Sequence, residues 1–403
     1  MAEPTNTPMP TAPPTPRSTS PAPPLPLIGA GSTSNPPSLS SSPTTSFAKP
    51  SLPTGGALGT KPVVLHIGDA IRYNPDAYSA FTTAFEVIRP SAAERSRDAF
   101  MAALRERRWG DFSAIFRPFW GTGGEMGQWD AELIALLPPS VRVFASAGAG
   151  FDWADVKLLG ETGIIYCNAG LAASEAVADF AVALIISTFR MLPYLITSAT
   201  SAATFSAAHD SATAQSHNLR SHVLGLVGLG NIGQQIAHRC RAGFGMEVAY
   251  YDVERKPADV EARLQTRYCE SLEALVRGAD CVVLCTPSGA GRLINKESLA
   301  WFRPGARFVN IARGTLVDEE ALADALEEGR VSNIALDVHA NEPEVNARLK
   351  AFAGTRALLT CHSAGGTVET HIGFEELSMR NITAVLSGGE AVTSVNLEWL
   401  RKS

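Results

Sequence analysis

The chain lacks the features of membrane and nucleic-acid-binding proteins. Its most apolar stretch, residues 176–186, contains Asp179 and is shorter than the roughly 18 apolar residues that a membrane span requires. The net charge of −6 argues against a surface for nucleic acid. We therefore expect neither a membrane nor a nucleic acid as a partner.

Cysteine is scarce and scattered. The six cysteines, at positions 167, 240, 269, 281, 285 and 361, include no CxxC pair. Unpaired thiols in a chain of this length favour a reducing compartment, and no charged and then apolar segment at the N-terminus resembles a secretion signal. We expect a cytoplasmic protein without a metal site.

Charge is almost missing from residues 1–60. Only Glu3, Arg17 and Lys49 are charged there, and more than half of the 26 prolines fall in this segment. Such a composition buries too little apolar surface to offset the entropy of ordering, which predicts a disordered tail. A mitochondrial transit peptide is the alternative, although a single arginine gives it poor support.

A glycine-rich turn organises the remainder of the chain. Residues 223–227 are an apolar run, glycines follow at 228, 230 and 233, and a helix start comes next. This is the strand, Gly-x-Gly-x-x-Gly turn and helix of a dinucleotide-binding unit, in which the glycines permit a tight turn, a close approach of pyrophosphate and close helix packing. The helix N-terminus offers N–H groups to the phosphates.

An acidic residue strengthens this interpretation. Asp252 ends the next predicted strand, residues 246–252, where a carboxylate accepts hydrogen bonds from the adenine ribose and repels a 2′-phosphate. NAD is therefore expected over NADP, although Arg255 and Lys256 follow closely and weaken the preference. NADP remains the alternative cofactor.

Strands alternate with helices on both sides of this unit. Predicted strands lie at 61–68, 112–116 and 141–146, and later at 280–286, 308–311 and 334–338; helices lie at 98–107, 131–137, 271–276, 319–328 and 367–386. This alternation predicts doubly wound parallel α/β sheets in two domains. Ser174 is the expected N-cap of a long helix reaching Met191, and residues 193–221 are expected to be a loop with one short helix.

Four segments follow predicted strands and would meet at the carboxyl edges of the sheets. They are residues 148–152, 310–314, 337–343 and 360–366. The first offers backbone N–H groups to an anion, with an ordinary loop as the alternative. The others bring Arg313, Asp337, Glu342 and His362 towards the cofactor.

These side chains suit reduction of a 2-oxo acid. Arg313 would bind the carboxylate and polarise the ketone, and His362 would donate a proton to the forming alkoxide. Glu342 would hold the histidine tautomer, and Asp337 would contact the nicotinamide. Arg313 and His362 also have structural alternatives, an ion pair and a loop histidine, while His339 and Cys361 are interpreted as structural and spectator residues.

The same motifs resemble those of the D-isomer-specific 2-hydroxyacid dehydrogenases, over about residues 61–400. Residues 147–153, Asp252 after two tyrosines, and residues 337–339 look most like the fungal D-mandelate dehydrogenase branch. The resemblance implies a flavodoxin-like substrate domain, residues 61–172 plus 367–403, into which a Rossmann cofactor domain, residues 173–366, is inserted. It also implies a homodimer built on the cofactor domains.

The resemblance implies specific site residues as well. Arg313, Glu342 and His362 form the catalytic set, and Ala149 and Gly150 bind the substrate carboxylate through backbone N–H groups. We expect the cofactor to contact Gly228, Gly230, Asn231, Ile232, Gly233, Asp252, Thr286, Pro287, Ala312, Asp337 and Ser174. Three departures stand out: Asp179 in place of Glu, Cys361 in place of Pro, and a shortened segment at 287–295 that puts the adenine-side contacts in doubt.

The sequence is compatible with either a bulky or a small 2-oxo acid as substrate. Phe119, Trp120, Phe151 and Trp153 would form an aromatic pocket for a bulky acid, or would be core residues. Without such a pocket, the nearer alternative is a glyoxylate or hydroxypyruvate reductase. An NADH-sensing binding protein of the corepressor type is the alternative from another class, distinguished by feeble turnover.

Overall fold

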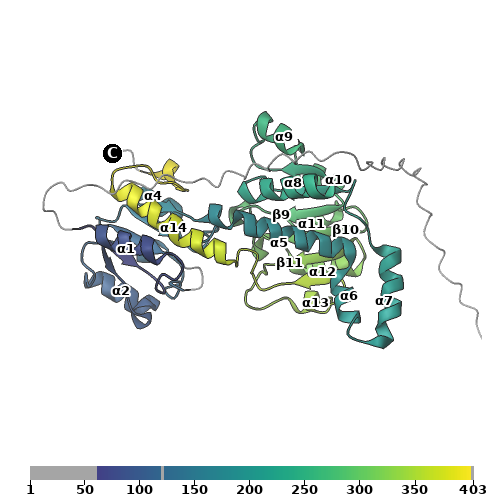
Figure 1. Ribbon diagram of the computed structural model, residues 1–403, viewed down its shortest axis with the longest axis horizontal. Coiled ribbons are helices and arrows are strands. Elements are labelled where there is room, and N and C mark those ends of the chain that lie inside the picture. The colour runs from purple at the N-terminus through teal and green to yellow at the C-terminus, as the bar shows by residue number, and fades with distance from the viewer. Residues whose placement is uncertain (1–60, 119–121, 401–403) are drawn as a thin grey trace, which may run out of the picture. The chain divides into compact units, whose positions relative to one another are not determined.

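Two parallel sheets form the core of the computed structural model (Figure 1), which describes residues 61–118 and 122–400. The chain separates into two units, residues 1–51 and 52–403, and all described residues belong to the second. The predicted disordered tail and the residues Phe119 and Trp120 lie outside the described residues.

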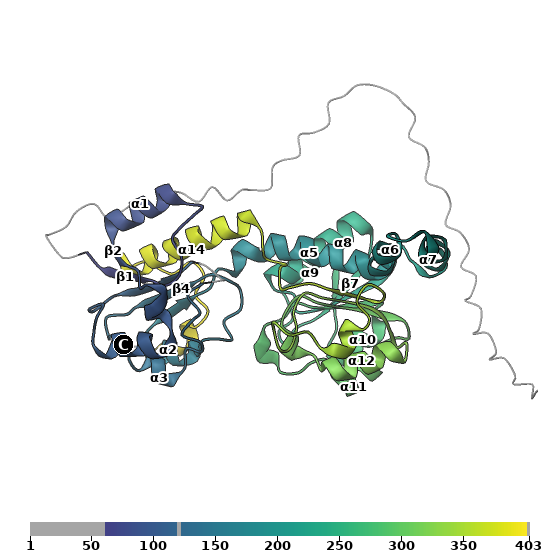
Figure 2. The same cartoon turned by 90° about the horizontal axis from the view of Figure 1, so that it is seen from below.

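The first sheet has five parallel strands in the order β2-β1-β3-β4-β5. The strands are β1 (Val63–His66), β2 (Glu86–Ile88), β3 (Ala114–Arg117), β4 (Val143–Ser146) and β5 (Ile165–Cys167). This order is that of flavodoxin-like sheets. Figure 2 shows α1 (Pro75–Ala84) and α14 (Val368–Leu386) on one face, and α2 (Arg97–Arg105) and α3 (Ala131–Ile134) on the other.

The second sheet has seven parallel strands in the order β12-β11-β10-β9-β6-β7-β8. The strands are β6 (Val223–Val227), β7 (Glu247–Tyr251), β8 (Thr266–Tyr268), β9 (Cys281–Leu284), β10 (Ala306–Asn310), β11 (Val331–Leu336) and β12 (Ala357–Leu359). The strand order reverses direction between β6 and β9, and ligands of Rossmann sheets bind at the carboxyl ends of strands at such a point.

Helices cover both faces of the seven-stranded sheet (Figure 2). On one face lie α5 (Gly170–Arg190), α8 (Asn231–Phe244) and α9 (Ala258–Leu264); on the other lie α10 (Leu272–Gly278), α11 (Lys296–Ala300) and α12 (Glu319–Glu327). Each face has its own apolar core, one including α5 and α8 and the other α10 to α12. The remaining helices are α4 (Val156–Glu161), α6 (Leu192–Ser198), α7 (Ala202–Gln215) and α13 (Ala347–Lys350). The predicted class, two doubly wound parallel sheets, is confirmed.

Several local predictions need correction. Ser174 is not an N-cap, because α5 already begins at Gly170 and the Ser174 hydroxyl donates to the Gly170 carbonyl, 2.9 Å away. The expected loop at 193–221 contains α6 and α7; α7 is rich in alanine, which favours helix. The elements α1, β2, α4, β5, α9, β8, α11 and α13 were not predicted.

The apolar stretch expected to be too short for a membrane span forms part of a longer helix. By length and composition alone, α5, with 21 residues, is long and apolar enough to cross a membrane. Its side chains Val177, Ala181, Leu184 and Ile185 are buried in the core shared with α8. A buried core helix of a soluble protein passes the same test, so the correction concerns the length of the helix.

Candidate active site

The glycine-rich turn after β6 has the geometry that its sequence predicts. Gly228 has a φ of +100°, and a Cβ there would lie 2.8 Å from the Cys285 carbonyl oxygen. A Cβ on Gly233 would lie 2.5 Å from the Gly228 oxygen, whereas one on Gly230 would meet no atom within 4 Å. The turn therefore packs tightly against the end of β9 but has free space at Gly230. The helix α8 begins at the next residue, Asn231, followed by Ile232.

Asp252 lies immediately after β7 and faces this turn. Its Oδ2 accepts a hydrogen bond from the Leu229 N–H at 2.9 Å and pairs with the Lys256 ammonium at 3.0 Å. The Arg255 guanidinium instead binds Glu261, with contacts of 2.8 and 2.9 Å. Of the two nearby cations, only Lys256 therefore reaches the acid.

The segments after β9 and β10 complete the cofactor side. Cys285 donates from its thiol to the Gly228 carbonyl at 3.0 Å, which places the following Thr286 and Pro287 beside the turn. Ala312 is buried, and its N–H donates to the Asn310 side chain at 3.0 Å. Ser174 lies buried inside α5, and the expected contacts of these residues with a cofactor stay predictions.

His362 and Glu342 form the pair that the sequence analysis expected. His362 Nδ1 lies 2.9 Å from Glu342 Oε2. Burial acts to raise the pKa of the Glu342 carboxyl, but the hydrogen bonds from His362 and from the His339 N–H outweigh it, so that the pKa is lowered. An ionised Glu342 carboxylate holds the imidazole through Nδ1. The other ring nitrogen, Nε2, is therefore the one that would exchange a proton with a substrate.

Asp337 organises the segment that carries this histidine. Its side chain is 1% exposed; one carboxylate oxygen accepts from the Thr360 hydroxyl and the Ser363 N–H, and the other from the Ala364 N–H. The His362 N–H in turn donates to the Asp337 carbonyl at 2.8 Å. The observed contacts are structural, and the expected contact of Asp337 with the nicotinamide stays a prediction.

Arg313 contacts the loop that follows β4. Its Nε lies 3.0 Å from Asp152 Oδ1, and its Nη1 donates to the Ala312 carbonyl at 2.7 Å. A Cβ on Gly150 would lie 1.4 Å from Arg313 Nη2. The guanidinium therefore lies against the backbone of the loop expected to bind a carboxylate. An ion pair was the structural alternative for Arg313, and the structure identifies Asp152 as the partner, which was not predicted.

Arg117 is a second residue that sequence reasoning missed. It ends β3 and is buried, and its guanidinium donates to the Gly123 carbonyl and the Ser146 hydroxyl at 2.9 and 3.1 Å. Burial lowers its pKa, and it stacks 4.5 Å from the centre of the Trp153 ring. Its carbonyl accepts a hydrogen bond from the Ala147 N–H, so that Arg117 supports the start of the loop at residues 148–152. Only its place at a strand end could have suggested it.

The other predicted residues divide between core and loop. Phe151 and Trp153 are half-buried and pack against Tyr166 at the margin of an apolar core of the five-stranded sheet, which favours the structural alternative for these two aromatic residues. His339 is buried and contacts the Thr360 carbonyl, as expected of a structural histidine. Ala149 contributes its carbonyl to the Asn168 amide.

The chain is similar to known proteins in sequence and in structure. Residues 182–364 match the family described as D-isomer specific 2-hydroxyacid dehydrogenase, NAD binding domain. A 4-methyl-2-oxopentanoate reductase A of Aspergillus oryzae is 31% identical over 74% of this chain and 88% of its own length. The holo form of D-mandelate dehydrogenase of Rhodotorula graminis has a TM-score of 0.80 and 39% identity, covering 84% of this chain and 98% of that one. An NADPH-dependent glyoxylate/hydroxypyruvate reductase of Sinorhizobium meliloti has a TM-score of 0.66 and 28% identity, covering 85% and 100%.

Proposed function

This chain belongs to the D-isomer-specific 2-hydroxyacid dehydrogenases, and from that premise we propose that it reduces bulky 2-oxo acids with NADH. The family assignment makes it an oxidoreductase that interconverts 2-oxo acids and D-2-hydroxy acids on an NAD(P)-binding domain. The proposal adds the preferred cofactor, the size of the substrate and the roles of the residues.

The observation that carries the reaction type is the Glu342–His362 pair, with its contact of 2.9 Å. His362 donates a proton to the ketone oxygen as it becomes an alkoxide, and takes the proton back in the reverse reaction. Glu342 orients the ring and stabilises its charged form. Arg313 binds the substrate carboxylate, beside the backbone N–H groups of Ala149 and Gly150, and polarises the ketone.

The turn after β6 fits a dinucleotide. The open side of Gly230 leaves space for a pyrophosphate, and α8 presents its N-terminus there. Asn231, Ile232, Thr286, Pro287 and Ala312 would complete the cradle. When bound, a nicotinamide dinucleotide supplies or accepts the hydride of the reaction.

The preference for NAD(H) rests on Asp252. Within the described part of the chain, Leu229 and Lys256 contact only Oδ2 of the carboxylate, which leaves Oδ1 to accept a hydrogen bond from a ribose hydroxyl. The negative charge also repels a 2′-phosphate. Lys256 reduces that repulsion, so the selectivity we propose is a preference and not an exclusion.

A bulky substrate is favoured by similarity. The relatives named above include enzymes named for 4-methyl-2-oxopentanoate and for D-mandelate, both larger than glyoxylate. The second candidate is a glyoxylate/hydroxypyruvate reductase, the activity named for the Sinorhizobium protein. Phe151 and Trp153 pack against the core, so they support an aromatic substrate pocket only weakly.

We also propose a homodimer in a reducing compartment such as the cytoplasm. Ile196 on α6 is 66% exposed and Phe205 on α7 is 58% exposed, and a second copy of the chain would cover such apolar side chains. All six cysteines are free, which supports the reducing compartment.

Light scattering during gel filtration tests the dimer. We expect a dimer mass for the unmodified protein and a shift towards the monomer mass for Phe205→Ser. A monomer mass for both proteins would contradict the dimer.

Loss of NADH absorbance with four acids tests the activity. Fast turnover of benzoylformate or 4-methyl-2-oxopentanoate supports the proposal, whereas preference for glyoxylate or hydroxypyruvate supports the second candidate. His362→Ala should bind NADH normally and lose roughly two or more orders of magnitude in turnover. NADH binding with no turnover of any acid by the unmodified protein would instead indicate an NADH-sensing protein.

A further inference from the structure

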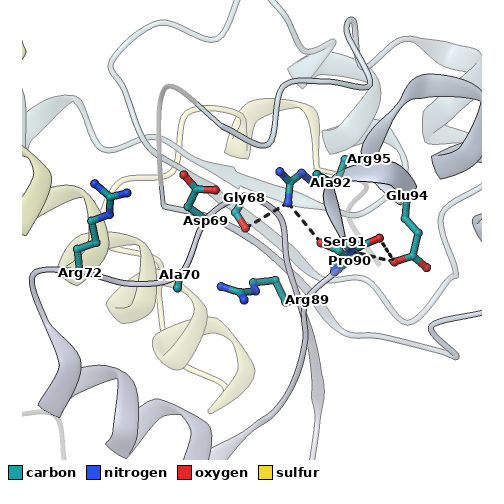
Figure 3. Close-up of a pocket in the computed structure, with 10 residues that line it drawn as sticks. All are labelled: Gly68, Asp69, Ala70, Arg72, Arg89, Pro90, Ser91, Ala92, Glu94 and Arg95. Carbon is teal, nitrogen blue, oxygen red and sulfur yellow. Dashed lines mark hydrogen bonds between the residues drawn. The ribbon is translucent and has the colours of Figure 1, made fainter.

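A cavity of about 660 Å³ opens at the carboxyl ends of β1 and β2 (Figure 3). It is lined by Gly68, Asp69, Ala70, Arg72, Arg89, Pro90, Ser91, Ala92, Glu94 and Arg95. The strand order places β1 two strands from β4, which separates the cavity from the Gly150 loop by roughly 10 Å across the sheet. None of its lining residues belongs to the proposed hydride-transfer site.

Arg95 holds the two rims of the cavity together. It is 7% exposed, and its Nη1 donates to the Gly68 carbonyl at 3.5 Å and the Pro90 carbonyl at 3.3 Å. Its charge is paired with Glu125 at 2.8 Å. Figure 3 shows the guanidinium of Arg95 between Gly68 and Pro90, so this arginine is a structural clamp and is not available to a ligand.

The loop after β1 is fixed from its other side by α14. The fully buried Glu375 carboxylate accepts hydrogen bonds from the backbone N–H groups of Arg72, Tyr73 and Asn74, at distances from 2.9 to 3.3 Å. Both walls are therefore held before any ligand arrives, and such preorganisation reduces the entropic cost of binding.

The charges that remain in the cavity are two arginines and one aspartate. The Glu94 carboxylate is occupied by the Ser91 N–H and hydroxyl and by Arg108. Among the described residues, the side chains of Arg72, Arg89 and Asp69 have no hydrogen-bond or ion-pair partner. Figure 3 shows the Arg89 side chain extended towards Ala70, with Asp69 drawn above these two residues and Arg72 at the far left.

The pKa of His66 is affected by the unpaired charge of Arg89. It ends β1 and is completely buried, and burial followed by the positive charge of Arg89 lowers its pKa to about 4. The imidazole is therefore neutral near pH 7 and neither adds to the charge of the cavity nor cancels it. The two guanidinium groups of Arg72 and Arg89 outweigh the single carboxylate of Asp69.

We propose that this cavity is a second ligand site, which binds a small carboxylate or phosphate anion that also carries a hydroxyl or amino group. Guanidinium groups bind both anions through paired N–H donors. Asp69 accepts a hydrogen bond from the hydroxyl or amino group of the ligand. Its charge also selects against larger polyanions.

Calorimetric titration with inorganic phosphate and with D-malate tests the site. The titrations use Arg313→Gln protein, because Arg313 would itself bind anions in the hydride-transfer site. We expect saturable binding of at least one probe, and the tighter probe identifies the phosphate or carboxylate class. Absence of saturable binding of both probes would overturn the proposal.

Substitutions in the same background locate the binding. Arg89→Gln and Arg72→Gln should each weaken binding by about tenfold or more, a loss of about 1.4 kcal/mol. The matched control is Arg142→Gln. This arginine is also exposed and lies at the amino end of β4, whereas the cavity lies at the carboxyl ends of β1 and β2, and its loss should leave affinity unchanged. Equal affinity in all three variants would show that the anion binds elsewhere. Thermal melts verify that each variant is folded.

Discussion

Arg313 Nε lies 3.0 Å from Asp152 Oδ1, an ion pair that joins segments 161 residues apart in the chain. A second edge of the same guanidinium is held by the Ala312 carbonyl. The remaining nitrogen, Nη2, lies directly over Gly150, where a side chain on that residue would otherwise lie. The loop after β4 can therefore approach the arginine this closely only with glycine at position 150.

Gly150→Ala should inactivate the enzyme without unfolding it. The new Cβ would lie 1.4 Å from Arg313 Nη2, and a flexible side chain end gives way more easily than backbone does. The displaced guanidinium would no longer bind the substrate carboxylate, and we expect kcat/KM to fall by roughly 100-fold or more, as when a forked contact is misplaced. Steady-state kinetics with a 2-oxo acid, together with a thermal melt, measure both effects.

Gly243→Ala is the matched control. Gly243 lies in α8, and a Cβ there meets no atom within 4 Å. Alanine is the better helix former by about 1 kcal/mol, so this variant should keep its activity and be equally or more stable. Normal turnover in Gly150→Ala would show that Arg313 does not act from its observed position.

Glu342→Gln should lower turnover more than it weakens substrate binding. The amide keeps the size of the side chain but cannot stabilise a charged imidazole, so kcat should fall by roughly ten- to 100-fold while KM changes little. Stopped-flow measurement of a single turnover separates the chemical step from product release. Unchanged kcat would remove Glu342 from the proposed catalytic set.

The same pair predicts how stability depends on pH. The pKa of Glu342 is lowered in the folded protein from its ordinary value of 4.5. Its contribution to stability is therefore complete above about pH 4.5 and is lost as pH falls through the lower, folded value. The difference in Tm between the unmodified protein and Glu342→Gln should shrink below pH 4.5, and only modestly, because the side chain is 36% exposed. A difference that grows in acid would contradict the sign of the shift.

Asp252→Ala should move the cofactor preference towards NADPH. The substitution removes the repulsion of a 2′-phosphate and releases the Lys256 ammonium, now 3.0 Å from the carboxylate, to bind that phosphate. The ratio of kcat/KM for NADPH to that for NADH should rise by about tenfold or more, equivalent to about 1.4 kcal/mol. Glu254→Ala, which removes an exposed acid two residues away, is the control and should leave the ratio unchanged. An unchanged ratio in Asp252→Ala would remove this residue from cofactor selection.

A single cysteine should react with a thiol reagent in the folded protein. Burial raises the pKa of Cys167, Cys240, Cys281 and Cys285 to about 12, and Cys269 is also buried. Cys361 is exposed. Absorbance assays with a disulfide reagent should therefore show one fast equivalent, absent from Cys361→Ser.

The same variant tests whether Cys361 is a spectator in the reaction. Cys361→Ser should keep its turnover, since the proposed reaction uses His362 and no thiol. A loss of turnover comparable with that of His362→Ala would contradict this assignment.

Local patterns predicted much of this protein because their chemistry is local. The apolar run, glycine spacing and acid of residues 223–252 define a strand, a turn and a helix over a short stretch, and β6, α8 and β7 follow it closely. The Glu342–His362 contact was also predictable, because carboxyl ends of parallel strands meet at one edge of a sheet. Shorter elements with weak patterns, such as β2 and α4, were missed.

The sequence by itself determined the fold class and the dinucleotide turn, and it predicted the three residues of the proposed catalytic set. Tertiary structure alone decided that Asp152 pairs with Arg313. It also decided that Arg117 supports the loop at residues 148–152 and that Asp337 holds the segment carrying His362. The reason is physical: apolar periodicity and glycine spacing specify the backbone over a few residues. The partner of a charged side chain, in contrast, depends on which distant segments the packed sheets bring within about 3 Å of it.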